Sequence, residues 1–273
     1  MTEYLRFAEQ ERSGWSDRNI IDAYVSKFGP ITGQVAEELA GWISATDKAV
    51  LDLCCGHGTL TALLCDSGAK VTGVDFSPEM LSLAKQLAPN ANLQRADATA
   101  LPCDDESFDF VVCNFGMMHL PDQPKALTEI HRVLRANGEF LMATWAEPED
   151  SPAFATVLGA IKAHANLSDA PQQPDLFTFA RPHEASGLFA AAGLRMTAHE
   201  TVTPAWTLSQ PEELFDNFWA GTVGVAMLIK RQTPNVVAAI RDQVTASVKE
   251  NFAVGDGYRV PVSVAVMSAA KER

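Results

Sequence analysis

Two hydrophobic periods alternate along the middle of this chain. Between Lys48 and Trp145, five short apolar runs are separated by segments whose apolar residues recur every three or four positions. Short apolar runs bounded by turn residues are typical of buried strands, and the longer period is typical of amphipathic helices. Leu127, Ile130 and Leu134, for example, form one stripe of a helix expected at 124–134. Strands that alternate with helices predict a parallel sheet covered by helices.

The pattern is different on both sides of this region. Residues 1–44 are expected to be helical, and residues 146–183, with five of the fifteen prolines, to form an insertion. Residues 204–257 form a second insertion, with helices expected in it. We therefore expect a sheet domain over 45–203 and 258–273 that contains the insertion 146–183, and a helical lid made of 1–44 and 204–257.

The sheet should resume after the first insertion. A helix is expected at 184–192, a strand at 194–203 and a final valine-rich strand at 258–267. Because Pro261 has no N–H to donate, ladder pairing in the final strand should begin after it.

Composition and charge indicate which kinds of partner to expect. The chain has 273 residues, 47% of them apolar and 20% charged, which suits a globular enzyme with a full core. Its formal charge of −13 repels phosphate backbones, so no nucleic-acid partner is expected. The N-terminal residues lack a signal-peptide layout and no apolar run reaches membrane-spanning length, so we expect a cytoplasmic location and no membrane span.

A glycine turn follows the first apolar run. It reads Asp52-Leu53-Cys54-Cys55-Gly56-His57-Gly58, and the second run ends on Asp75, nineteen residues after Gly56. Glycines let a ligand approach the backbone where a helix starts, and an acid at this distance can accept two hydrogen bonds from a ribose diol. The unit predicts a nucleoside-containing cofactor.

Two cofactors remain open on this loop alone. A pyrophosphate fingerprint needs a third glycine, and Thr61 stands in its place. Asp52 would be poorly placed beside a pyrophosphate, whereas it suits the ammonium group of S-adenosylmethionine.

Further motifs follow in order. They are Ser77-Pro78-Glu79-Met80, Asp97–Pro102, Phe108–Asn114, His119-Leu120-Pro121-Asp122 and Glu129–Glu139. Over residues 45 to 146 this succession closely resembles the class I S-adenosylmethionine-dependent methyltransferases, and most of all the small-molecule branch typified by ubiquinone/menaquinone biosynthesis methyltransferases. The family usually has glycine where Cys54 stands. The resemblance implies a Rossmann-like α/β fold with a seven-stranded sheet, mostly parallel, whose last strand is antiparallel and inserted between the fifth and sixth.

The resemblance also implies cofactor roles. Gly56 and Gly58 would line the methionine part, Asp75 would hold the ribose with Met80 nearby, Asp97 and Ala98 would take the adenine, and Asn114 would face the sulfonium. Asp52, Cys54 and Phe76 complete the expected cofactor-binding set.

His119 is the expected catalytic residue. It follows the fourth strand, at the rim where an acceptor must approach the methyl group, and a histidine can exchange a proton near neutral pH. It would act as base or as substrate orienter, unless its role is structural. Trp15 and Tyr24 are either core aromatics or substrate contacts.

The predicted reaction is an in-line methyl transfer from S-adenosylmethionine to a small organic acceptor, with an oxygen or carbon nucleophile favoured. Aromatic residues of the insertions, such as Trp206, Phe215 and Phe218, suggest that the acceptor is fairly apolar. No metal is expected, because the cysteines lack ligand spacing. The alternatives are a non-catalytic protein of the same fold that binds cofactor or partner, and a nicotinamide-dependent oxidoreductase.

Overall fold

A central sheet organises the computed structural model, which describes residues 4–168 and 170–272. Within these residues the sheet has seven strands in the order β3-β2-β1-β4-β5-β10-β6. β10 runs antiparallel to both of its neighbours, β5 and β6, while the other strands are parallel. The predicted fold class is therefore confirmed, including the position of the antiparallel last strand. The strands are β1 (Ala49–Leu53), β2 (Lys70–Asp75), β3 (Asn92–Arg95), β4 (Phe108–Asn114), β5 (Leu134–Trp145), β6 (Leu194–Val202) and β10 (Val264–Lys271).

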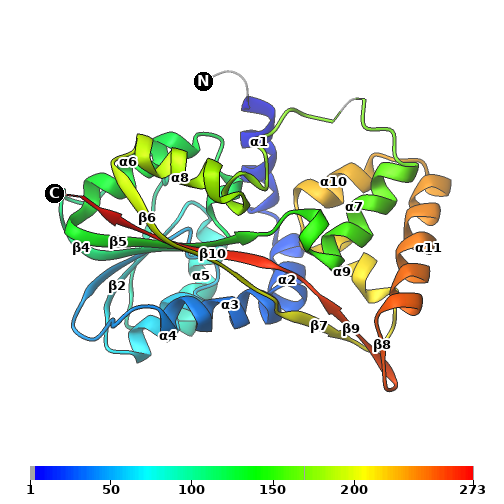
Figure 1. Cartoon of the computed structure of the whole chain (residues 1–273), viewed down its shortest axis with the longest axis horizontal. Coiled ribbons are helices and arrows are strands. Elements are labelled where there is room, and N and C mark those ends of the chain that lie inside the picture. The colour runs from blue at the N-terminus through cyan, green and yellow to red at the C-terminus, as the bar shows by residue number, and fades with distance from the viewer. Residues whose placement is uncertain (1–3, 169, 273) are drawn as a thin grey trace.

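Helices cover both faces of this sheet. Successive side chains of a strand point to opposite faces, so Val50 joins one core and Leu51 the other. The Val50 core includes apolar residues of α3 (Gly29–Gly41) and α4 (Thr59–Asp66), while the Leu51 core includes those of α6 (Gln123–Val133) and α8 (Pro182–Ala191). Figure 1 shows these two pairs on opposite sides of the sheet. α5 (Pro78–Leu87) follows β2 and starts at a Ser77 cap, whose hydroxyl accepts a hydrogen bond from the Met80 N–H.

A helical region extends the molecule beyond the carboxyl ends of the parallel strands (Figure 1). It contains α7 (Pro152–His164), α9 (Glu213–Gly221), α10 (Gly224–Lys230) and α11 (Pro234–Asn251). A small sheet, in the order β7-β9-β8, joins it to the rest through β7 (Ala205–Leu208), β8 (Ala253–Val254) and β9 (Gly257–Pro261). None of the helices in the described part of the chain is long and apolar enough to cross a membrane.

The final strand differs from the prediction. Residues 258–267 do not form one strand: the chain leaves β9 at Pro261 and enters the central sheet as β10 at Val264. Pairing also starts before Pro261, since Tyr258 and Val260 pair with β7. The missing N–H of Pro261 falls on the last residue of β9, where it ends the ladder instead of delaying it.

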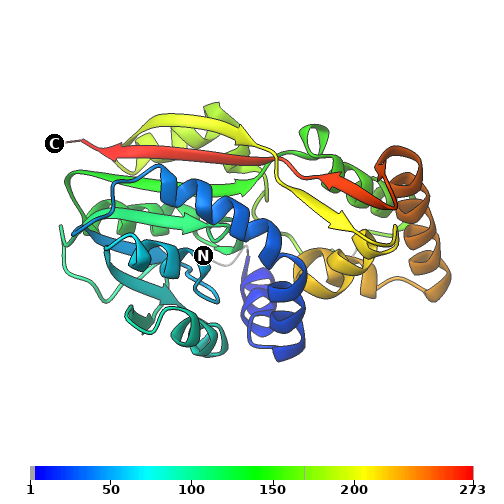
Figure 2. The ribbon, with the colours of Figure 1, turned by 90° about the horizontal axis from the view of Figure 1, so that it is seen from below.

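The N-terminal helices lie between the two parts. α1 (Leu5–Gly14) and α2 (Arg18–Lys27) stand beside the carboxyl ends of the sheet, next to the helical region (Figure 2). Phe28 joins them to that region, with its ring 5.2 Å from Trp206 and 5.4 Å from Phe218. The N-terminal helices are thus packed against the segment with which they were predicted to form a lid, and the lid role itself remains a prediction.

Candidate active site

A cleft opens where β1, β2 and β4 end, the edge at which open α/β sheets bind ligands. It has an inner hollow of about 80 Å³ and an outer hollow of about 430 Å³. Both are lined by Cys54, Asp75, Phe76 and His119; Gly56, Met80 and Asn114 line the inner hollow, and Asp97 and Ala98 the outer one. We name the two hollows together the cofactor cleft. The fold thus brings together most of the residues that the sequence singled out for the cofactor.

Asp75 lies at the end of β2 with both carboxylate oxygens bonded to backbone. Oδ2 accepts from the N–H of Gly56 at 2.9 Å and Oδ1 from the N–H of Ser77 at 2.8 Å. Burial raises the pKa of Asp75, and the backbone donors at Ser77 and Gly56 offset part of that rise. Each oxygen keeps a second lone pair. The carboxylate is therefore held rigidly and can still accept hydrogen bonds from a diol.

Of the two glycines in the turn, Gly56 lines the cofactor cleft and Gly58 does not. Gly58 has φ +92° and lies outside the walls of the hollows, and a Cβ there would meet the Cα of Ala84 at 2.8 Å. Gly58 thus packs the turn closely against α5, and its contact with the methionine part stays a prediction. Cys54 also has a positive φ, 56°. Its side chain packs over Gly116, where an added Cβ would lie 2.5 Å from the Cys54 Cβ.

Asp52 is placed differently from the expectation. Its side chain is only 1% exposed and does not line the cofactor cleft. The hydroxyl of Thr61, the residue in the position of the missing third glycine, donates to Asp52 Oδ2 at 2.6 Å. Burial raises the pKa of Asp52 to about 7. Alternation along β1 turns the Asp52 side chain towards Thr61 on α4, and a contact with the ammonium group stays a prediction.

Asn114 lines the inner hollow and carries an unpaired acceptor. Its Nδ2 donates to the carbonyl oxygen of Thr32 at 3.0 Å, which fixes the amide. Its Oδ1 is buried and has no hydrogen-bond partner among the described residues. An unpaired buried acceptor costs about 1–3 kcal/mol, so this position favours a ligand that donates. The ammonium group of S-adenosylmethionine is such a donor.

The charges of the cleft favour a cationic ligand over a diphosphate. Within the described chain, no lysine or arginine lines the inner hollow. Arg12 and Lys125 line the outer hollow beside four acids, Glu11, Asp75, Asp97 and Asp122. Asp97 also closes a local turn, since its Oδ1 accepts from the N–H and the hydroxyl of Thr99, both at 2.8 Å.

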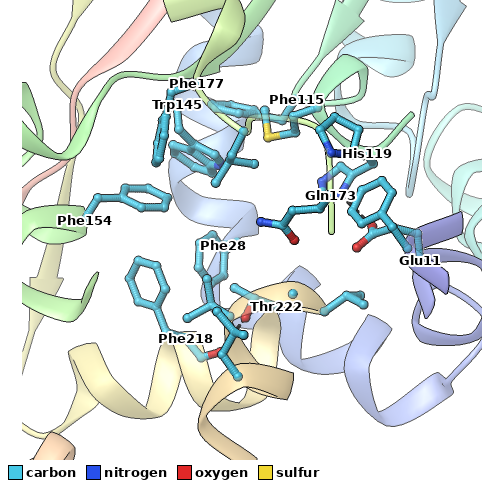
Figure 3. A pocket seen from close by; sticks show the side chains of 18 of the residues that line it. Glu11, Phe28, Phe115, His119, Trp145, Phe154, Gln173, Phe177, Phe218 and Thr222 are labelled. Carbon is cyan, nitrogen blue, oxygen red and sulfur yellow. Dashed lines mark hydrogen bonds and ion pairs between the residues drawn. The ribbon is translucent and has the colours of Figure 1, made fainter. Parts of the chain in front are cut away.

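A second cavity, which we name the aromatic cavity, adjoins the inner hollow. It has a volume of about 270 Å³ and shares Trp15, Tyr24, Phe115 and His119 with the cofactor cleft. Figure 3 shows Phe28, Trp145, Phe154 and Phe218 around it, with Gln173 reaching across and Glu11 beside His119. The aromatic rings that line it are Phe7, Trp15, Tyr24, Phe28, Phe115, Trp145, Phe154, Phe177 and Phe218.

Trp15 and Tyr24, which the sequence leaves open as core aromatics or substrate contacts, lie at the junction of the aromatic cavity and the inner hollow. Their rings meet edge to face at 5.1 Å. Burial raises the pKa of Tyr24 to about 12, so its hydroxyl is neutral. Of the insertion aromatics expected to indicate an apolar acceptor, Phe218 lines the cavity, whereas Trp206 and Phe215 belong to the core.

His119 lies at the meeting point of the three hollows, on the short 3₁₀ turn Met117–His119. Its Nδ1 lies 2.7 Å from Oε2 of Glu11, which also accepts from Trp15 Nε1 at 2.9 Å. The Trp15 and His119 rings meet edge to face at 5.3 Å. Sequence reasoning did not find Glu11. The only signal was its spacing of four from Trp15, which places both side chains on one face of a helix.

The comparisons with known proteins agree with this geometry. Residues 51–142 match the family described as "Methyltransferase domain". A demethylmenaquinone methyltransferase of Lactiplantibacillus plantarum is 40% identical over 114 residues, which cover 38% of this chain and 48% of that protein. The chain spans about half the length of the curated relatives it matches, 48%, 53% and 43% for the first three.

Solved structures share the fold over most of the chain. A Bacillus halodurans protein assigned as a methyltransferase is 17% identical, with a TM-score of 0.59 over 88% of this chain and 100% of its own. The [4+2]-cyclase SpnF is also 17% identical, with a TM-score of 0.54 over 88% of this chain and 80% of its own. The domain match over residues 51–142, the similar relatives and the order of strands together support a class I S-adenosylmethionine-dependent methyltransferase.

Proposed function

We propose that this protein transfers a methyl group from S-adenosylmethionine to a small, planar and largely apolar acceptor through an oxygen or an acidic carbon. The observation that carries the proposal is the aromatic cavity, which meets the cofactor cleft at His119. A nucleophile in the cavity would have the imidazole beside it and the inner hollow in front of it. The relatives are named for an acceptor of their own, demethylmenaquinone. For this chain, the wall of rings supports an acceptor with an aromatic or conjugated core.

The residues of the cleft fit the cofactor. When bound, S-adenosylmethionine supplies an electrophilic methyl group on a sulfonium that is a good leaving group. Asp75 would hold the ribose diol, Asn114 Oδ1 the ammonium group, and Asp97 and Ala98 the adenine. Cys54, Gly56, Phe76 and Met80 would pack around the remainder. Asp52 and Gly58 would act through the shape of the turn.

The protein then has two tasks, alignment and removal of a proton. Rings on several sides of the aromatic cavity restrict a flat acceptor to few orientations and exclude water, which is how positioning lowers a barrier. His119 would accept the proton of the attacking hydroxyl or carbon acid. Trp15 and Tyr24 would hold the acceptor at the junction, where Tyr24 keeps its hydroxyl proton.

The test is turnover with methyl-labelled S-adenosylmethionine and a panel of planar phenols and enols of one to three rings, followed by mass spectrometry of the product. We expect methylated phenol or enol and S-adenosylhomocysteine in equal amounts. His119→Ala should lower the rate by about 10²–10⁴ while affinity for S-adenosylmethionine stays nearly unchanged. Full activity in a folded His119→Ala variant would leave alignment alone as the mechanism.

Two other outcomes point to the alternatives. Tight cofactor binding without methyl transfer to any member of the panel would favour a non-catalytic role or another reaction, as the cyclase neighbour illustrates for this fold. Binding of NADH in preference to S-adenosylmethionine would favour an oxidoreductase.

A further inference from the structure

We propose that Glu11 is a positioning residue for His119: it fixes the imidazole in one tautomer and one orientation, with Nε2 left free to take the proton of the acceptor. This makes α1, which precedes the sheet domain in the chain, a part of the catalytic apparatus. The kinetic consequence rests on the proposed function, whereas the tautomer does not.

The geometry is that of a base and its orienting carboxylate. Glu11 and His119 are 108 positions apart, yet Nδ1 and Oε2 lie 2.7 Å from each other. The Glu11 side chain is 6% exposed and that of His119 is 31% exposed. The carboxylate is therefore enclosed while the imidazole reaches the space where an acceptor and a cofactor would meet.

The chemistry of the contact decides the tautomer. An ionised carboxylate can only accept hydrogen bonds, so a neutral His119 must carry its proton on Nδ1. Nε2 then holds a lone pair, and it has no hydrogen-bond partner within residues 4–168 and 170–272. In metal and catalytic sites, the partner of one ring nitrogen commonly sets the state of the other in this way.

Trp15 holds the carboxylate in turn. Its Nε1 can only donate, and it donates to the same Oε2 at 2.9 Å, from one helical turn further along the chain. Two donors on one oxygen fix the carboxylate on the His119 side. An enclosed carboxylate among aromatic rings is costly unless its bonds are made, so a contact needed only for packing would be met more cheaply by an apolar side chain.

The first experiment reads the tautomer without an acceptor. Imidazole nitrogen shifts are measured by long-range ¹H–¹⁵N NMR, with His119 assigned from its missing signals in His119→Asn and the pH raised until the ring is neutral. In the wild type we expect a protonated-type shift at Nδ1 and an unprotonated-type shift at Nε2. Glu11→Ala should give mixed tautomers. Glu9→Gln is the matched control, because it removes an exposed carboxylate from the same helix and should leave the His119 shifts unchanged.

The second experiment reads catalysis on any phenol of the panel that the wild type methylates. Glu11→Ala should lower kcat at least about tenfold, with KM and affinity for S-adenosylmethionine changed less than about threefold. Glu11→Asp should recover part of kcat, since it restores the acceptor on a shorter side chain.

The outcomes are distinct. Wild-type His119 with its proton on Nε2, or a single unchanged tautomer in a folded Glu11→Ala variant, would overturn the positioning role. So would a loss in Glu11→Ala confined to KM, which would show that Glu11 only holds α1 against the cavity. If no phenol is methylated, the proposed function fails while the nitrogen shifts still decide on Glu11.

Discussion

Asp75 is the carboxylate that we propose to bind the ribose of the cofactor. Its two oxygens are fixed by the N–H groups of Gly56 and Ser77, at 2.9 and 2.8 Å. Rigid acceptors lose little entropy on binding, so the two hydrogen bonds to a ribose should count in full.

Asp75→Ala should therefore weaken S-adenosylmethionine binding at least about tenfold, because each charge-assisted hydrogen bond contributes roughly 1.5–3 kcal/mol. Isothermal titration calorimetry measures the change. Asp66→Asn, which neutralises an exposed acid on α4, should bind as the wild type does. Equal affinity in Asp75→Ala and wild type would remove Asp75 from the ribose site.

Asp52 should control the pH dependence of stability. Its pKa rises from 3.8 to about 7 on folding because burial disfavours the charge. Between these values the unfolded chain releases the proton while the folded chain keeps it, so rising pH favours unfolding up to about pH 7 and has no further effect above it.

In Asp52→Asn this fall in the free energy of unfolding with rising pH should disappear. From about pH 5 to pH 8, the free energy of unfolding of the wild type should fall by about 2 kcal/mol more than that of the variant. Urea denaturation at both pH values measures it, with Asp66→Asn again as the control. Identical pH dependence in Asp52→Asn and wild type would show that Asp52 is ionised in the folded protein throughout.

At the scale of elements, the hydrophobic periods predicted the alternating strands and helices between β1 and β5, since most of these elements bury apolar residues at helical spacing or in a short run. They did not predict β7 and β8, which have only four and two residues. The valine-rich run at 258–267 also hid the change of sheet between Pro261 and Val264, because valines recur in both halves. Of the site, the loop and strand-end residues were predictable from their spacing. Glu11, Phe115 and Trp145 were not, since only the packing of distant segments brings them to the cavity.

α1, α2 and residues 204–257 should behave as a lid over the two cavities, whereas α3, in the same predicted segment 1–44, packs against the sheet. α1 and α2 supply Glu11, Trp15 and Tyr24 to the junction, while α9 supplies Phe218. Limited proteolysis should cut these segments before the sheet domain, and S-adenosylhomocysteine should slow the cleavage. Earlier cleavage within Lys48–Trp145, or equal rates with and without the ligand, would contradict a lid.

At the scale of the whole molecule, the net charge and the lining of the cofactor cleft both favour a cationic cofactor. A chain with formal charge −13 presents a cleft whose inner hollow is lined, within the described residues, by Asp75 and no lysine or arginine. This arrangement disfavours a dinucleotide with two phosphates and favours a sulfonium.

Thermal unfolding with each ligand tests that preference. S-adenosylmethionine and S-adenosylhomocysteine should raise Tm, whereas NAD and NADP at the same concentration should not, since only a ligand that binds the folded state stabilises it. Adenosine is a useful control, because it keeps the ribose and adenine contacts and lacks the ammonium group. A rise in Tm with NAD as large as that with S-adenosylmethionine would contradict the assignment of the cleft.

The contact between Cys54 and Gly116 has a consequence for the substitutions that this turn can accept. A side chain at position 116 would collide with Cys54, with 2.5 Å between the two Cβ atoms, and with the Cys113 Sγ at 2.6 Å. The left-handed backbone of Cys54, at φ 56°, would suit a glycine equally well. A larger residue at position 116 should therefore require changes at both neighbours, because glycine at position 54 would remove one collision and leave the Cys113 Sγ at 2.6 Å.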